Sequence, residues 1–260
     1  MTHIDVLAEL AQVPEVRALC DQTRDLLDEV AWDRALRRAD ADFWTGVRRW
    51  CGYASASLDG ATMPRDALVE PDASAMGRLS LAGLMVTAAA DDDTQLRAPM
   101  QLWAHLHSVA DGGPERGRPR TDEMVVDPLH LGAVPPSSIV ADRLADLSTS
   151  VAGSRAPGVL VAALCHAELA TVRPFRNHSY LVARATPRVV LRAAGLDLPG
   201  AAALEAGMAA VGRPRYVAAL RAYQAGEMPE YLAFFRDSVQ AGIAQTRFLH
   251  RNGGFTNEVV

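Results

Sequence analysis

The stretch His166-Ala-Glu-Leu-Ala-Thr-Val-Arg-Pro-Phe-Arg-Asn-His-Ser-Tyr-Leu-Val-Ala-Arg184 holds the clearest structural signal in the chain. The segment 157–171, rich in Ala, Val and Leu, is apolar on all sides, which indicates a buried core helix. A second helix is expected over about 182–194, with Gly195 at its end and Pro187 inside it as a source of a kink. The stretch therefore predicts two packed helices joined by a short polar loop.

The frame of this stretch resembles the signature of Fic-domain proteins. In that family a helix carrying His, then Phe or Leu, then Ile or Val runs into a loop of the form His-Pro-Phe-x-acid-Gly-Asn-Gly-Arg, and a further Arg follows in the next helix. The matching residues here are His166, Leu169, Val172, Pro174, Phe175 and Arg184. The resemblance spans about 55–235 and implies an all-α, mainly helical Fic-like fold with a short β-hairpin flap. It also implies an activity class, the transfer of a nucleoside monophosphate, usually AMP from ATP, onto a protein hydroxyl.

The residues that perform this chemistry in the family are replaced. The family's base is a His, and Arg173 stands at its position. Arg173 stays protonated at any working pH and cannot accept a proton. Asn177 replaces the acid that binds magnesium, and its neutral carbonyl is a much weaker ligand for a hard cation. The resemblance thus implies that general-base and metal functions are both lost.

The phosphate-binding part of the loop is replaced as well, by His178-Ser179-Tyr180-Leu181. Glycines at these positions let backbone N–H groups surround a phosphate at a helix N-terminus. His178 and Tyr180 place side chains there, and Leu181 has no donor where the family has an Arg. We expect no intact catalytic residue and no cofactor, with ATP and Mg²⁺ bound only if the family activity persists. Arg184 and His178 stay candidates for phosphate contacts, and His178 is also the alternative base.

A second resemblance lies upstream, in Ser55-Ala56-Ser57-Leu58-Asp59-Gly60. It is similar to the inhibitory motif of Fic proteins whose self-inhibiting helix is N-terminal. The resemblance implies that Ser55, Asp59 and Gly60 belong to that motif and that Asp59 pairs with Arg184. Asp is one methylene shorter than the family's Glu, so we expect a looser pair or a small shift of the helix. From the residues alone, Asp59-Gly60 is equally typical of a helix end followed by a turn.

The segment 117–127 sits where Fic proteins place a Gly-x-x-Arg stretch and a β-hairpin flap that holds a target by strand addition. Arg120, Val125 and Val126 are its candidate residues, because the valines favour a strand and Pro128 ends it. The alternative is a solvated, Arg-rich loop. The pair Pro135-Pro136 is expected to begin a helix that continues to about residue 147.

Helical periodicity covers most of the remaining chain, over about 13–36, 41–58, 72–90, 94–109, 215–223 and 230–247. The run Asp91-Asp92-Asp93-Thr94 is expected to cap a helix rather than bind a metal, because neighbouring side chains do not converge. The expected layout is a helical extension over 1–60 that includes the inhibitory helix, a Fic-like domain over 61–250 and a flexible tail over 251–260.

The composition limits which classes of partner and which cellular compartment are expected. A net charge of -5 in 260 residues argues against nucleic acid or a membrane as the main partner. All basic residues are Arg, which with the abundant Ala is typical of GC-rich bacterial coding. The cysteines, Cys20, Cys51 and Cys165, lack the spacing of a disulfide framework or zinc site. No stretch has membrane-spanning length or the pattern of a signal peptide, so a bacterial cytoplasm is expected.

The sequence supports two hypotheses of different classes. The first is a pseudoenzyme, a Fic-like fold kept as an interaction or regulatory module with an unknown protein partner or a second copy of itself. The second is a nucleotide-dependent transferase, with AMP or a sugar-nucleotide donor, in which Arg173, His178 and Arg184 face the phosphates. Fold resemblance alone does not decide between them.

Overall fold

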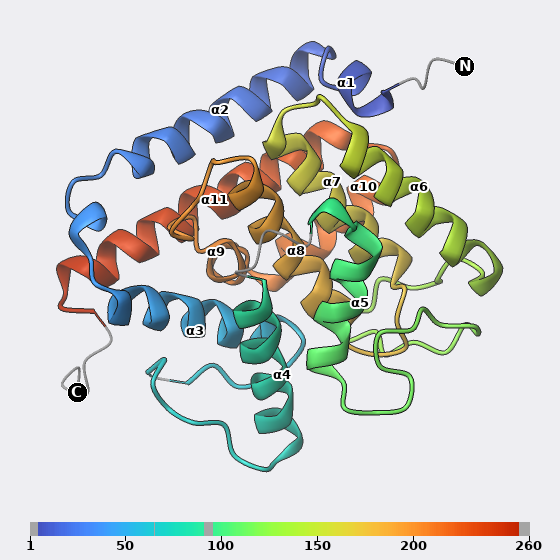
Figure 1. Ribbon diagram of the computed structural model, residues 1–260, viewed down its shortest axis with the longest axis horizontal. Helices are drawn as coiled ribbons and strands as arrows, with labels where there is room; N and C mark the ends of the chain where they lie inside the picture. Colours follow the sequence, from blue (N-terminus) through green and yellow to red (C-terminus); the bar gives the residue numbers. More distant parts are fainter. Residues whose placement is uncertain (1–4, 65, 91–95, 255–260) are drawn as a thin grey trace.

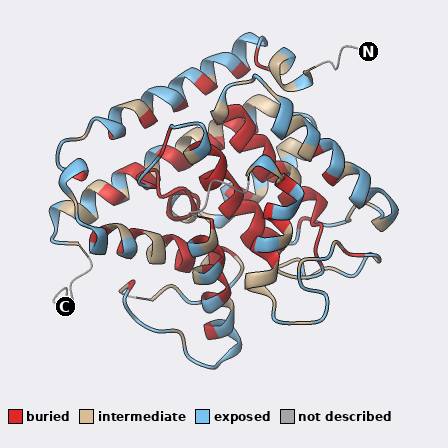
Figure 2. Cartoon of the chain, viewed as in Figure 1, coloured by how far each residue is buried: buried red, intermediate tan, exposed pale blue. Residues whose placement is uncertain are grey.

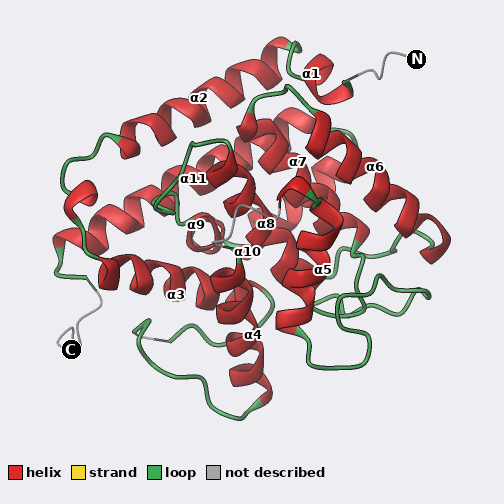
Figure 3. Cartoon of the chain, in the orientation of Figure 1, coloured by secondary structure: helices red, strands yellow, loops and turns green. Residues whose placement is uncertain are grey.

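A computed structural model describes residues 5–64, 66–90 and 96–254, which form helices joined by loops (Figure 1). In chain order the elements are α1 Val6–Leu10, α2 Pro14–Ala31, the 3-10 turn η1 Leu36–Arg38, α3 Ala41–Leu58, α4 Ala75–Ala89, α5 Pro99–Ala110, η3 Ser137–Ile139, α6 Val140–Gly153, α7 Gly158–Val172, α8 Ser179–Ala193, α9 Leu204–Val211, α10 Arg213–Gln224 and α11 Met228–Arg251. No strand occurs in these ranges (Figure 3).

The predicted β-hairpin flap is therefore wrong. The segment 117–127 is irregular, and its backbone bonds to the loop between α7 and α8 rather than to itself. The Arg120 N–H donates to the Pro174 carbonyl at 2.7 Å, and the Val126 N–H donates to the Arg176 carbonyl at 2.7 Å. Since a hairpin would need its own cross-strand bonds, these two contacts replace the ladder that Val125 and Val126 suggested.

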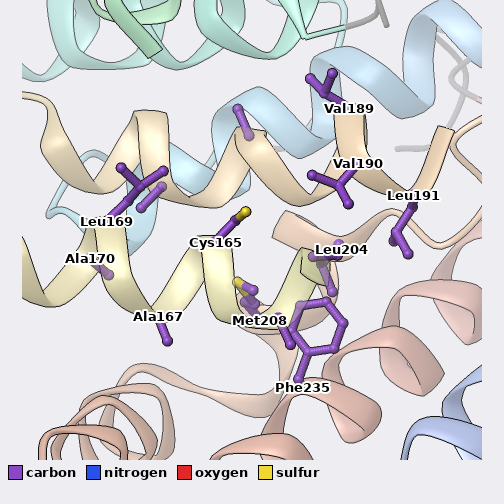
Figure 4. Packing of buried hydrophobic residues seen from close by; sticks show 14 of the residues in the cluster. Cys165, Ala167, Leu169, Ala170, Val189, Val190, Leu191, Leu204, Met208 and Phe235 are labelled. Carbon is purple, nitrogen blue, oxygen red and sulfur yellow. The ribbon is translucent and has the colours of Figure 1, made fainter. Parts of the chain in front are cut away.

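Helices α7 and α8 form the centre of the molecule. Almost every residue of α7 is buried, and α8 packs along it with a face that is equally covered (Figure 2). Figure 4 shows this core, in which side chains of α7 and α8 meet those of α9 and α11. Pro187 does not end α8, which continues to Ala193. The core position of these two helices fixes both ends of the loop between them.

The N-terminal helices are part of the same core. Helix α2 lies along α11, and α3 packs against α4 and α9. Val16, Cys20, Leu27 and Val30 of α2 are buried in the same apolar cluster as α7. The region predicted as an extension thus covers surface that the rest of the chain would otherwise expose.

Two short helices, α1 and α9, were not predicted, because neither is long enough to show helical periodicity. The acidic run at 91–93 with Thr94, and the tail from 255 onward, lie outside the described residues. Among the described helices none has both the length and the apolar character needed to cross a bilayer.

Candidate functional site

The loop between α7 and α8, residues 173–178, is hereafter called the motif loop. It begins and ends with left-handed residues, Arg173 at φ 48° and His178 at φ 54°. A side chain in this conformation costs about 1 kcal/mol, which glycine would avoid. The Ser179 hydroxyl closes the loop by accepting from the Phe175 N–H and donating to the Phe175 carbonyl, both at 2.9 Å. Both ends of the loop thus adopt a backbone conformation that glycine would reach without this cost.

Arg173 is fully buried, and its guanidinium binds a turn of its own chain. Nη1 donates to Asp127 Oδ2 at 2.9 Å and to the Gly132 carbonyl at 3.0 Å, and Nη2 donates to the Ala133 carbonyl at 2.7 Å. Arg173 therefore holds the turn at 127–133 against the motif loop instead of facing an open cleft.

Asp127 is the centre of this contact. Its second oxygen accepts from the Tyr180 hydroxyl at 2.6 Å, while the Gly132 N–H donates to Oδ2 at 3.2 Å. Burial and the bond to Asp127 raise the pKa of Tyr180 well above its ordinary value. Tyr180 is thus a neutral donor that helps Arg173 to hold the same carboxylate.

Arg120 makes a parallel set of bonds and is itself buried. Nε donates to the Arg173 carbonyl at 2.9 Å, Nη1 to the Asp122 carbonyl at 2.8 Å and Nη2 to the Pro135 carbonyl at 2.6 Å. Arg120, which was predicted to belong to a flap, therefore holds the segment around Asp122 and Pro135 against the motif loop. Val126, by contrast, is 60% exposed.

Asn177 is held by a residue that the sequence did not single out, His107 of α5. His107 Nδ1 accepts from the Gly117 N–H at 2.9 Å, so the ring proton lies on Nε2, which donates to Asn177 Oδ1 at 3.0 Å. The His107 ring stacks on Phe175, with centroids 4.0 Å apart. Burial lowers the pKa of His107, in keeping with this neutral tautomer. Nothing in the spacing of a lone histidine so far upstream could have indicated this role.

Arg184 lies one helical turn and more beyond the loop, and both it and the Asp59 side chain are buried, at 0% and 5% exposure. Its Nη2 donates to Asp59 Oδ2 at 2.7 Å and to the Ser55 carbonyl at 2.9 Å, and its Nε donates to the Ser55 hydroxyl at 2.8 Å. The pair is close, so the shorter acid does not loosen it. Asp59 is also the C-cap of α3 and Gly60 has φ 107°, so this segment is a helix end with a turn as well.

His166 lies in a buried hydrogen-bond network with the hydroxyl groups of two tyrosines. Tyr231 donates to the Ala163 carbonyl at 2.7 Å and therefore accepts from His166 Nδ1–H at 2.7 Å, which leaves Nε2 to accept from Tyr216 at 2.9 Å. Burial lowers the pKa of His166 to about 3. The ring is a neutral structural link between α7, α10 and α11.

His178 is the exception in this site. It is half-buried, and no described residue hydrogen-bonds to its ring. Burial, and then the nearby His107, lower its pKa. Ser179 and Leu181, which follow it, are buried in the first turn of α8. Over the described ranges no three His, Cys, Asp or Glu side chains are grouped closely enough to bind a metal ion.

Comparison with known proteins identifies the fold. No family model and no curated protein sequence matches the chain. A solved structure of Fic-1 from C. elegans is 19% identical, with a TM-score of 0.65 over 95% of this chain and 76% of that one. A Fic family protein from Desulfovibrio desulfuricans G20 is 15% identical, with a TM-score of 0.65 over 95% of this chain and 78% of that one. The chain has a Fic fold, and at these identities the likeness concerns the fold alone.

Proposed function

We propose that this Fic-fold protein does not transfer AMP and acts as an interaction or regulatory module. The observation that carries the proposal is Arg173, which stands at the family's base position with its guanidinium bound to Asp127, Gly132 and Ala133. A permanently charged side chain bound to its own chain can neither accept a proton nor approach a substrate hydroxyl.

The residues present do not fit a magnesium nucleotide. The one oxygen that Asn177 offers already accepts from His107 at 3.0 Å. Arg184, which the resemblance assigns to phosphate, is occupied by Asp59 and Ser55. Cation, metal ligand and base are thus each bound within the chain, and we derive no reaction step through ATP or Mg²⁺.

The partner contact lies on the loop held by Arg120 and Arg173. Its fixed backbone presents Met124, 65% exposed, and Val126, 60% exposed, to solvent. A rigid loop loses little conformational entropy on binding, which favours recognition of a protein surface. The partner is then an unidentified protein or a second copy of this chain.

The alternative is binding of a nucleotide phosphate, with or without transfer. It is favoured by one observation: His178 is left-handed, and the Ser179, Tyr180 and Leu181 N–H groups at the start of α8 have no acceptor among the described residues. A helix N-terminus of this kind attracts anions. Of the cations assigned to this alternative, Arg173 and Arg184 are fully buried and paired.

Incubation with ATP or nucleotide sugars and Mg²⁺, followed by intact mass measurement, tests the proposal. We expect no adduct on wild type or on Asp59→Asn, which removes the charge opposite Arg184 but keeps the side-chain shape. Calorimetric titration with the same ligands separates binding from transfer. An AMP or sugar adduct would overturn the proposal, whereas heat without an adduct would support a module that binds a phosphate ligand.

The partner contact has its own test. Met124→Glu and Val126→Glu change exposed side chains without touching the Arg120 or Arg173 bonds, and Met76→Glu on α4, 54% exposed, is a matched control. Partner capture and native mass should change for the loop variants and stay unchanged for the control. Equal behaviour of all three variants would remove the loop from the proposal.

A further inference from the structure

A small apolar pocket lies away from the motif loop, between the end of α2 with η1 and the loop that joins α8 to α9. Figure 1 shows where these helices lie in the fold. Its volume is about 260 Å³. The apolar wall consists of Val30, Ala31, Leu36, Trp44, Leu196, Leu198, Pro199 and Ala201. A dry cavity of roughly 150 Å³ holds one benzene ring, so this pocket has room for a ring with a short substituent.

Two ionisable residues of opposite charge line the pocket. Of its lining residues only Arg37 and Asp197 are ionisable. Both oxygens of Asp197 already accept backbone bonds, from the Ala201 N–H at 2.7 Å and the Ala202 N–H at 3.1 Å. The carboxylate is buried and serves the loop rather than the cavity. Because it is buried and both of its oxygens are engaged by the backbone, it is a weaker anchor for a charged ligand than the exposed Arg37.

Arg37 is the positively charged residue of the pocket wall. Its guanidinium has no carboxylate partner among the described residues, and it lies 5.4 Å from the centroid of the exposed Trp32 ring. Stacking on an aromatic face leaves the edge of a guanidinium free to donate in its own plane. An apolar cavity with one unpaired cation at its wall matches a ligand with an apolar body and one negative end.

We propose that this pocket binds a small aromatic monocarboxylate, with the ring against Trp44 and Leu196 and the carboxylate on Arg37. The site does not depend on the function proposed for the motif loop. A ligand there contacts both the N-terminal helices and the loop that follows α8, so binding stabilises the contact between them.

Titration calorimetry with phenylacetate, and with its neutral amide phenylacetamide, tests the proposal. For a ligand of this size we expect a Kd of about 0.1–1 mM for phenylacetate and binding about fivefold to tenfold weaker for the amide. Arg37→Gln should remove the difference between the two ligands. Arg34→Gln, an exposed Arg nearby that does not line the pocket, is the matched control and should keep it.

A second variant tests the location. Ala31 lies on the exposed rim, so Ala31→Phe fills the cavity without altering a buried position. Loss of binding of both ligands in this variant, with an unchanged melting temperature in their absence, supports the site. The proposal is overturned if phenylacetate shows no binding at concentrations several times the expected Kd, or if the amide binds as tightly as phenylacetate. It is also overturned if Arg34→Gln removes the difference between the two ligands as Arg37→Gln does.

Discussion

Arg184 shows how a buried cation joins segments that lie far apart in the sequence. It is completely buried, and its ion-pair partner, Asp59, comes from α3. Neighbouring Arg173 is equally buried and also bound to a carboxylate, that of Asp127. Each of these two buried cations is thus matched by an acid from another segment, which ties those segments to the motif loop and to α8.

Removal of the acid should therefore be costly. We expect Asp59→Ala to lower the free energy of unfolding by about 3–5 kcal/mol, because Arg184 is left charged and buried. The double variant Asp59→Leu with Arg184→Met should recover most of that loss, since it removes both charges. Asp122→Ala, which breaks the exposed pair with Arg176, is the control and should cost less than about 1 kcal/mol. Urea unfolding measures all four proteins, and a small loss for Asp59→Ala would contradict the structural role.

His166 gives a pH dependence whose sign follows from its environment. Burial holds the folded-state pKa at about 3, below the ordinary value of 6.5. As the pH falls from 6.5 towards 3, the unfolded chain takes up a proton that the folded chain does not, so stability falls. The stabilisation is complete above pH 6.5 and declines by at most about 1.4 kcal/mol per pH unit below it.

Other groups also titrate in this range, so a difference measurement is needed. Urea unfolding of wild type and His166→Gln at a series of pH values isolates the histidine. We expect the variant to be less stable at neutral pH and to show a shallower decline on acidification. Parallel curves would mean that the pKa of His166 is the same in the folded and the unfolded chain.

At this scale the sequence predicted some contacts and not others. The pairing of Asp59 with Arg184 follows from two motif matches, because each match gives its residue a fixed place in the fold. The partners of Arg173 and Asn177 could not be predicted, since Asp127 ends a segment that was expected to form a flap and His107 lies in a helix with no motif of its own. The left-handed backbone at His178 could not be predicted either, because a histidine in the sequence does not indicate that conformation.

At the scale of the elements, close helix contacts depend on glycine. A Cβ on Gly207 of α9 would lie 1.9 Å from the Ser238 carbonyl oxygen of α11, and one on Gly242 would lie 1.9 Å from the Ala202 carbonyl oxygen. Both contacts are with backbone, which cannot move aside as a flexible side chain would. Helix α9 and the residues just before it can therefore lie on α11 only with glycine at these positions.

Gly207→Ala and Gly242→Ala should each destabilise the fold by about 2 kcal/mol or more, because the helices must separate. Gly153 ends α6, and a Cβ there meets nothing within 4 Å. Gly153→Ala is accordingly expected to be neutral or slightly stabilising. Thermal unfolding followed by circular dichroism compares the three variants. A neutral Gly207→Ala would show that α9 can shift on α11 without cost.

The elements also show where local propensity fails. Helices α3 and α7 were predicted to within a residue of their ends, because long periodic or apolar runs are reliable signals. The strands expected at Val125 and Val126 are absent, since the motif loop takes the backbone bonds of that segment. Tertiary hydrogen bonding overrides a weak strand preference, and a single sequence does not reveal it.

At the scale of the whole molecule, the question is whether the predicted boundary at residue 60 separates two regions that fold independently. The segment before it supplies Asp59 to Arg184, and α2 covers α11 with the buried side chains of Val16, Leu27 and Val30. A chain limited to 61–260 would carry an uncompensated buried cation and an exposed apolar face on α11. We infer that the extension and the Fic-like region unfold together.

Expression of 61–260 beside the full chain tests this inference. We expect the shorter chain to lack a cooperative transition, with tryptophan fluorescence and circular dichroism failing to coincide, whereas the full chain gives one transition by both probes. An intermediate form, 39–260, keeps α3 and the partner of Arg184 but lacks α2, and it should fold with reduced stability. Cooperative unfolding of 61–260 at wild-type stability would make the first 60 residues a separable accessory. Asp59 would then be a contact that the motif loop can lose, as a releasable inhibitory helix requires.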